Sequence, residues 1–234
     1  MNEAERQEIL IKAKEFFRNR IAKKHEENTR KLSTLKHFNV NPFTHKYLAQ
    51  FVFGDSSPES MAKALVYPRA MGTSIATTFG TQLQFFCNDV LTSFASTTSG
   101  IDIEFVDVVD GRRKYCQVKA GPTTINNDDV VTIIDHFQAI RNLARTNHLD
   151  LGVNDCVVGV FYGTRKSLSG AYKKIEKNYP VYVGQEFWYR LTGDRDFYDE
   201  LINAFVEVAD EMDSSTMIDE IIKRLSHEIE ENCD

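Results

Sequence analysis

The sequence predicts an α/β fold in which a small mixed central sheet is flanked by helices, together with a helical subdomain at the N-terminus. Residues 101–105 alternate strictly between apolar and acidic side chains, which is typical of a strand with one buried face. Residues 156–162 form a near-continuous apolar run, which indicates a strand buried on both faces. We therefore expect a helical N-terminal region over residues 1–56 and a core with C-terminal helices over residues 57–234.

The first half of the chain is predicted to be helical, because apolar residues recur at steps of three and four opposite charged faces. Proline marks the expected boundaries. Pro42 closes a break after two asparagines, Pro58 suits a first helical turn, and Pro68 is expected to interrupt a helix. Helices are expected over residues 3–36, 43–53, 58–67 and 72–94.

The second half combines strands with helices. Asp110-Gly111 is typical of a two-residue hairpin turn, so residues 114–120 are expected to return antiparallel to residues 101–105. Trp188 is expected to anchor the core. Asn126, Asn127 or Asp128 can cap a helix that runs to about residue 146. The other expected elements are a short strand over residues 180–183 and helices over residues 196–210 and 214–231.

Composition excludes several classes of protein. No apolar run approaches the roughly 20 residues that a membrane-spanning helix needs, and the charged start lacks the apolar segment of a signal peptide. The four cysteines form no CxxC pair, which argues against a zinc site and a disulfide framework. We therefore expect a cytoplasmic protein with reduced thiols and no membrane association. The net charge of −6 does not favour a nucleic-acid partner, although basic residues predominate in the first segment.

Four polar residues are expected to share one face of the hairpin. With a two-residue turn, Asp102 lies opposite Lys119 and Glu104 lies opposite Gln117, so two carboxylates, an amide and an amine converge on one patch. A solvated face with cross-strand ion pairs has the same spacing, and spacing alone leaves both interpretations open. Alternation fails over residues 105–109, where a bulge could shift the pairing.

This grouping suits the hydrolysis of a phosphodiester, which needs neutralised charge and an activated water. Hard oxygen ligands that hold Mg²⁺ supply both effects. On this hypothesis Asp102 is the central metal ligand, and Glu104 and the amide oxygen of Gln117 are further ligands. The main-chain carbonyl of Val118 completes the metal shell. Lys119 orients or deprotonates the water, or stabilises developing negative charge.

The residues around the hairpin resemble a known family. Gly100-Ile101-Asp102 followed by Gln117-Val118-Lys119 resembles the PD-(D/E)xK nuclease signature, which by itself is a weak motif. The longer string over residues 115–130 is more specific and is similar to the PmeII group of type II restriction endonucleases, as are residues 69–74 and 183–188. The resemblance implies a restriction-endonuclease-like core that uses Mg²⁺.

The sequence departs from this signature at two positions. Gly100 precedes the strand aspartate where proline is usual, which matters little. Gln117 stands where Asp or Glu is usual, which removes one formal negative charge from the metal site. An amide oxygen can still bind Mg²⁺, and QxK versions of the signature occur in active enzymes. Our hypothesis is that Glu104 restores the missing charge.

The resemblance further implies a homodimer that cuts both strands of double-stranded DNA at a short palindromic site, with a cognate DNA methyltransferase as genetic partner. Residues 1–56 then serve dimerisation or DNA contact. The residues expected to contact DNA are Arg69, Thr73, Ser74, Thr123, Thr124, Asn126, Asn127 and Lys166. Helix capping is the competing interpretation for several of them. Two other functions stay open, a structure-specific or repair nuclease of the same fold and a non-catalytic DNA-binding protein.

Overall fold

The computed structural model describes residues 2–212 and 216–232. The chain divides into two compact units. The sheet unit comprises Met1–Phe16 and Gln82–Phe205, and the helical unit comprises Phe17–Thr81 and Val206–Asp234. The predicted N-terminal region, residues 1–56, is therefore shared between the two units, and its role in dimerisation or DNA contact stays a prediction.

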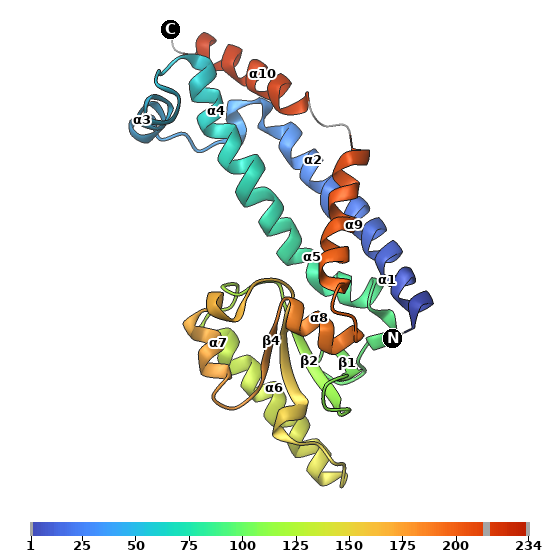
Figure 1. Cartoon of the computed structure of the whole chain (residues 1–234). Helices are drawn as coiled ribbons and strands as arrows, with labels where there is room; N and C mark the ends of the chain where they lie inside the picture. Colours follow the sequence, from blue (N-terminus) through green and yellow to red (C-terminus); the bar gives the residue numbers. More distant parts are fainter. Residues whose placement is uncertain (1, 213–215, 233–234) are drawn as a thin grey trace. The chain divides into compact units, whose positions relative to one another are not determined.

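The sheet unit is built on four strands in the order β1-β2-β3-β4. β1 and β2 are antiparallel, whereas β2, β3 and β4 run parallel. This small mixed sheet with helices on both faces confirms the predicted α/β class (Figure 1). The strands are β1 (Ile103–Val106), β2 (Arg113–Lys119), β3 (Cys156–Val160) and β4 (Val181–Val183).

One face of the sheet is covered by α6 (Asn127–Thr146) and α7 (Gly170–Ile175), through a core that includes Val158, Phe137 and Tyr172 (Figure 1). α6 begins at the predicted cap: the Asn126 side chain accepts the N–H groups of residues 128 and 129, completing a capping box. The buried stripe of α6 faces the sheet, and this fixes the directions in which the remaining side chains of the helix point.

The opposite face is covered by α8 (Gln185–Thr192). Gly159 permits this close approach, since a Cβ there would lie 2.4 Å from the Phe187 ring. Trp188 is fully buried and its indole N–H donates to the carbonyl of Phe161 at 2.9 Å, which confirms its prediction as a core anchor.

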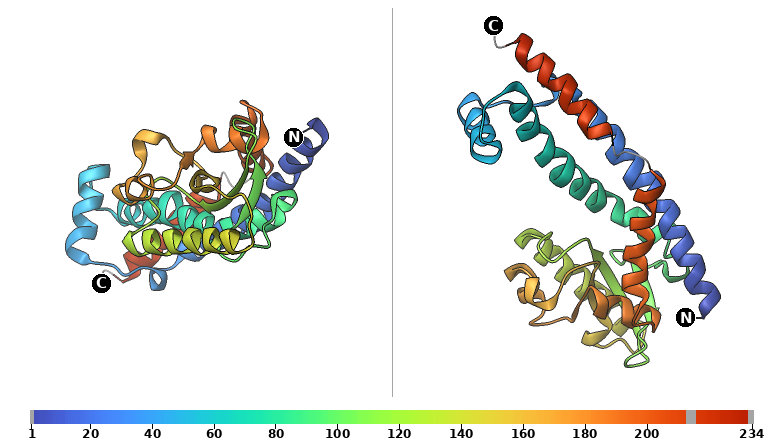
Figure 2. Two further views of the ribbon diagram at one scale, coloured as in Figure 1. Left: turned by 90° about the horizontal axis from the view of Figure 1, so that it is seen from below. Right: turned by 45° about the horizontal axis from the view of Figure 1, so that its top comes forward.

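The helical unit has its own apolar core, in which α10 packs along α4 through residues such as Val66, Ile221 and Leu225 (Figure 2). Asn41 caps α3 at its start, and Gly54 ends it in the left-handed conformation. The helices of the chain besides those of the sheet faces are α1 (Glu3–Phe16), α2 (Lys23–Arg30), α3 (Pro42–Phe53), α4 (Pro58–Pro68), α5 (Ile75–Asp89), α9 (Phe197–Glu211) and α10 (Met217–Glu231).

The helices differ from the prediction at Pro68. The predicted interruption at Pro68 is wrong, because α4 continues through a π-helical turn (Arg69–Ser74) directly into α5. The wider turn accommodates the missing N–H of proline without breaking the helix. The predicted start of the last helix, residue 214, lies outside the described residues. Among the helices described, none is long and apolar enough to cross a membrane.

The predicted hairpin register is wrong by two residues. Glu104 pairs with Tyr115 rather than Gln117, and Ile103 pairs with Cys116. The turn is wider than two residues, because the N–H of Asp107 donates to the carbonyl of Arg112 at 2.9 Å and the N–H of Gly111 donates back to Asp107. A slip of two residues preserves the face of every side chain, since the strand period is two.

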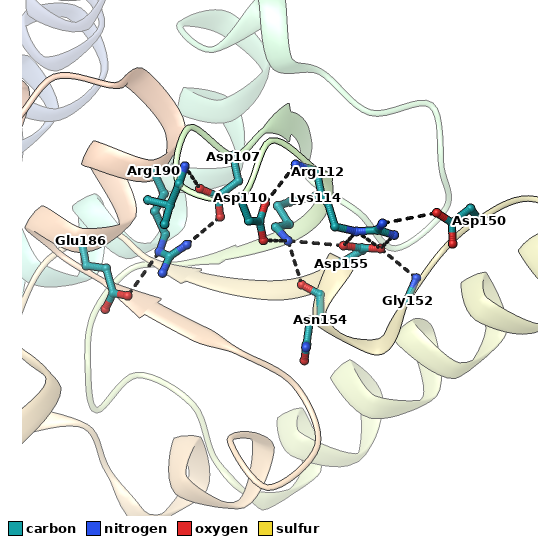
Figure 3. A network of polar contacts seen from close by, with 11 residues as sticks. Asp107, Asp110, Arg112, Lys114, Asp150, Gly152, Asn154, Asp155, Glu186 and Arg190 are labelled. Carbon is teal, nitrogen blue, oxygen red and sulfur yellow. Dashed lines mark hydrogen bonds and ion pairs between the residues drawn. The ribbon is translucent and has the colours of Figure 1, made fainter.

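A buried ionic network holds this wider turn (Figure 3). Lys114 is 0% exposed, and its ammonium donates to Asp110 at 2.6 Å and Asp155 at 3.3 Å. Arg112 also donates to Asp155, from Nε at 2.8 Å. These hydrogen bonds with Arg112 lower the pKa of the Asp155 carboxyl to about 2. The network therefore fixes the turn to the residues that precede β3.

Replacing Asp155 with asparagine is expected to destabilise the protein by about 3 kcal/mol at neutral pH, because the buried ammonium of Lys114 loses a counter-charge. The difference in unfolding free energy between the variant and wild type should shrink as the pH falls from 3.8 towards about 2. Because folding lowers the pKa of Asp155, its carboxylate stabilises the folded state at pH values above the pKa of the unfolded chain. This stabilisation is lost when the carboxylate of the folded protein is protonated. Urea unfolding over this pH range measures both effects.

Asp150→Asn is the matched control, because it removes an exposed partner of the same Arg112. It should change stability by less than about 0.5 kcal/mol. Equal losses in the two variants would contradict a special role for the buried pair.

Candidate active site

Four of the predicted site residues, Asp102, Gln117, Val118 and Lys119, lie near the carboxyl end of β2. The backbone N–H of Asp102 donates to the carbonyl of Cys116 at 3.0 Å, which continues the β1–β2 ladder past the end of β1. The carboxylate of Asp102 accepts the N–H of Val118 at 2.7 Å through Oδ2. Asp102 thus lies beside Cys116 and Val118 and not, as predicted, opposite Lys119.

The carbonyl of Val118 points to the same edge as Asp102. Successive residues of a strand direct their backbone groups to alternate edges. The carbonyl of Lys119 accepts the N–H of Phe161 on the β3 side, so the groups of Val118 face the β1 side. Beyond the end of β1 this edge is where the carboxylate of Asp102 lies.

Gln117 and Lys119 lie on the face of β2 that α6 covers, because they pair with Val158 and Val160. Gln117 is 5% exposed, and its amide nitrogen contacts the carbonyl of Gly100 at 2.7 Å and Nδ1 of His136 at 2.9 Å. Lys119 is half-buried, and within the described residues its ammonium has no hydrogen-bond or ion-pair partner. It is therefore free to meet an anion or a water.

His136 is a site residue that sequence reasoning missed. No HxH or HExxH spacing points to it. The available signal was its place on α6, three residues after Ile133 and four before Ile140, at the border of the buried stripe. A polar residue at that border faces the sheet, but the sheet residue that it meets depends on tertiary packing.

Glu104 shares the face of Gln117, but its carboxylate is already bonded. Oε1 accepts the hydroxyls of Ser96 at 2.6 Å and Thr98 at 3.0 Å, and Oε2 pairs with Arg113 at 3.2 Å. These contacts draw the carboxylate towards the residues that precede β1. Glu104 does not lie opposite Gln117 as predicted, because it pairs with Tyr115.

Burial raises the pKa of Asp102, while the N–H of Val118 and the charge of Lys119 act in the opposite direction. A buried carboxylate whose charge is only partly compensated favours a cation nearby. No group of three or more His, Cys, Asp or Glu side chains in the described part of the chain could hold a metal ion. The carboxylate of Asp102 and the carbonyl of Val118 are hard oxygens, as is the amide oxygen of the neighbouring Gln117, and such donors fit Mg²⁺ rather than a transition metal.

The predicted DNA contacts of the sheet unit follow β2. The Asn126 side chain is the cap of α6, so the capping interpretation is confirmed for it. The Asn127 amide oxygen accepts from Lys174, and the Thr124 hydroxyl donates to Gly121. Thr123 and Lys166 are exposed.

Three other predicted contacts, Arg69, Thr73 and Ser74, line one groove of about 310 Å³ within the helical unit. Lys31 and His37 lie in the same groove, together with the hydroxyls of further threonines. No acid occurs among the described residues that line it. The groove therefore combines positive charge with neutral hydrogen-bonding groups, a composition that suits phosphate oxygens.

A small mixed sheet flanked by helices, with an aspartate just before β1 and a lysine at the end of the adjacent β2, defines a restriction-endonuclease-like core. The family model described as type II restriction endonuclease EcoO109I matches residues 10–213, and the chain belongs to this family. Among curated protein sequences none matches the chain. The family implies a nuclease that acts on double-stranded DNA.

Asp102→Asn is expected to raise the thermal unfolding midpoint when divalent cations are absent. The amide avoids the cost of a buried charge, and its oxygen can still accept the N–H of Val118. Removing this buried charge should stabilise the protein by on the order of 1 kcal/mol, or about 2–4 °C for a chain of this size. Calorimetry in EDTA measures it, with the exposed Asp135→Asn as control. A lower midpoint for Asp102→Asn would contradict the burial cost.

Proposed function

We propose that this chain is a type II restriction endonuclease, similar to the PmeII group, that hydrolyses both strands of DNA at a short palindromic site with Mg²⁺. The observation that carries the proposal is the end of β2, where the carboxylate of Asp102 is bound by the N–H of Val118 and the ammonium of Lys119, unpaired among the described residues, acts electrostatically on it. The homodimer, the cytoplasmic location and the partner methyltransferase remain predictions.

Each residue has a distinct role in the proposed reaction. Asp102, the amide oxygen of Gln117 and the carbonyl of Val118 would hold Mg²⁺, which when bound neutralises phosphate charge and lowers the pKa of water. The N–H of Val118 fixes one oxygen of Asp102 and so orients the carboxylate. Lys119 orients the attacking water or stabilises negative charge that develops on the phosphate. The carboxylate of Glu104 would contribute negative charge and not a direct metal ligand, since Ser96, Thr98 and Arg113 hold it.

The unpartnered ammonium of Lys119 favours a catalytic role over a solvated face with ion pairs. In a merely structural hairpin, the lysine would pair with the neighbouring carboxylates. Here Glu104 pairs with Arg113 instead, and Asp102 accepts from the backbone. A half-buried lysine left without a partner among the described residues is a group kept available for an anion.

Incubation of the protein with plasmid DNA and Mg²⁺ tests the proposed function. Discrete fragments are expected; a smear would support a nuclease without site preference, and intact DNA would support a non-catalytic binding protein. Lys119→Ala and Asp102→Asn should each lower the cleavage rate by about 10³-fold while leaving DNA binding intact. Glu104→Gln is the comparison: an unchanged rate would remove the compensation hypothesis for Glu104 and leave the other roles standing.

The groove of the helical unit is proposed to contact the DNA backbone. Arg69→Ala and Lys31→Ala should each weaken binding of all duplexes alike, and each should reduce the slope of log affinity against log salt by about 0.9. Fluorescence anisotropy in Ca²⁺ at several salt concentrations measures this slope. Lys223→Ala, an exposed lysine of α10 outside the groove, should leave it unchanged. An unchanged slope in the groove variants would rule out these phosphate contacts.

A further inference from the structure

The amide of Gln117 is held by two acceptors. Gly100 offers a backbone carbonyl, which can only accept, so the group that faces it at 2.7 Å must be the NH₂ of the glutamine. The same nitrogen lies 2.9 Å from Nδ1 of His136. Both amide hydrogens are therefore used, and Nδ1 of His136 must be the unprotonated, accepting nitrogen of the ring.

The amide oxygen of Gln117 is consequently turned away from both partners. Among the described residues it accepts no hydrogen bond, and it is not one of the buried polar atoms that lack a partner. The oxygen is therefore accessible, and it is free to bind a water or a cation while the nitrogen is held. The oxygen belongs to the residue that precedes Val118, whose backbone groups lie at the edge of Asp102.

Gly100 and α6 together fix the position of the histidine ring. Gly100 has φ of +77°, and a Cβ there would lie 2.7 Å from Cγ of His136. The ring thus packs on the bare α-carbon of the residue whose carbonyl holds the same amide. Ile133 and Phe137 anchor α6 in the core on either side of His136.

We propose that His136, with the carbonyl of Gly100, is a positioning residue that selects an amide rather than a carboxylate at position 117 and directs its oxygen to the cation. This inference rests on the proposed function and deepens it. Gln117 is then a metal ligand whose orientation is set by its neighbours, and Gly100 contributes to that orientation.

The proposal has a consequence that runs against the usual signature. Gln117→Glu restores the acidic residue of the PD-(D/E)xK pattern, but a carboxylate has no hydrogen to offer to the carbonyl of Gly100, which can only accept. One of its oxygens would face that carbonyl at about the present 2.7 Å. The imidazole of His136 can meet a carboxylate only by carrying its proton on Nδ1, the opposite of its present role. We therefore expect the restored glutamate to turn away from Gly100 and to weaken the site.

Mn²⁺ affinity provides the main test, measured by electron paramagnetic resonance on the protein bound to duplex DNA in the inactive Lys119→Ala background. His136→Ala should weaken Mn²⁺ binding by about 10–100-fold, the usual effect of removing the partner of a metal ligand. His136→Asn keeps an acceptor near the place of Nδ1 and should retain most of the affinity. Gln138→Ala, exposed on the same helix, is the control and should match wild type.

NMR supplies a second readout without metal or DNA. The side-chain NH₂ signal of Gln117, assigned with Gln117→Ala, should move in His136→Ala, and the Nδ1 signal of His136 should be that of an unprotonated nitrogen. Unchanged Mn²⁺ affinity in His136→Ala, or tighter binding in Gln117→Glu, would overturn the proposal. A wild-type protein that cuts no DNA would refute the proposed function, whereas the NMR signals would still decide the position of the amide. Circular dichroism establishes that each variant is folded.

Discussion

The pairing of β2 with a neighbour on each side is the constraint on which the rest of the sheet unit depends. β1 runs antiparallel to β2 and β3 runs parallel to it, so two ladders set the face of every residue in β2. Gln117 and Lys119 consequently lie on the face of α6, while Val118 lies on the face of α8. A slip of one residue would exchange the two sets and place an ammonium against the apolar side chains below α8. The chemistry of the site is thus a consequence of backbone pairing.

Long-range ion pairs decide this register against a strong local signal. Asp110-Gly111 favours a two-residue turn, yet the carboxylate of Asp110 binds Lys114 and that of Asp107 binds Arg190, 83 positions along the chain. Lys114 is also tied to Asp155, 41 positions away. A buried ammonium without these partners would cost several kcal/mol, more than the preference of one turn type over another. The turn therefore widens to suit the ion pairs.

Features that depend on residues close together in the sequence could be predicted, whereas features that depend on contacts between distant residues could not. The start of α4 at Pro58 and the cap of α6, which is Asn126 of the three predicted candidates, depend on a few neighbouring residues, and both were within reach of the sequence. The shared face of Glu104, Gln117 and Lys119 was also predictable, because a register error of two leaves faces unchanged, whereas Asp102 precedes β1 and its carboxylate lies at the strand edge. The partner of Glu104 and the contact of His136 with Gln117 were not, since each joins segments whose separation is set by tertiary packing.

On the proposed function, the charge of the site determines when it can hold a cation. Asp102 has one oxygen occupied by a backbone N–H, Gln117 contributes no formal charge, and Glu104 is neutralised by Arg113. Mg²⁺ sites usually combine one or two carboxylates with phosphates of the substrate. A site with so little charge of its own depends on the DNA phosphate for the rest, so cation binding and DNA binding each strengthen the other by the same factor. An amide held in place by His136 and Gly100 supplies a ligand oxygen without adding charge, and this keeps cation uptake conditional on DNA.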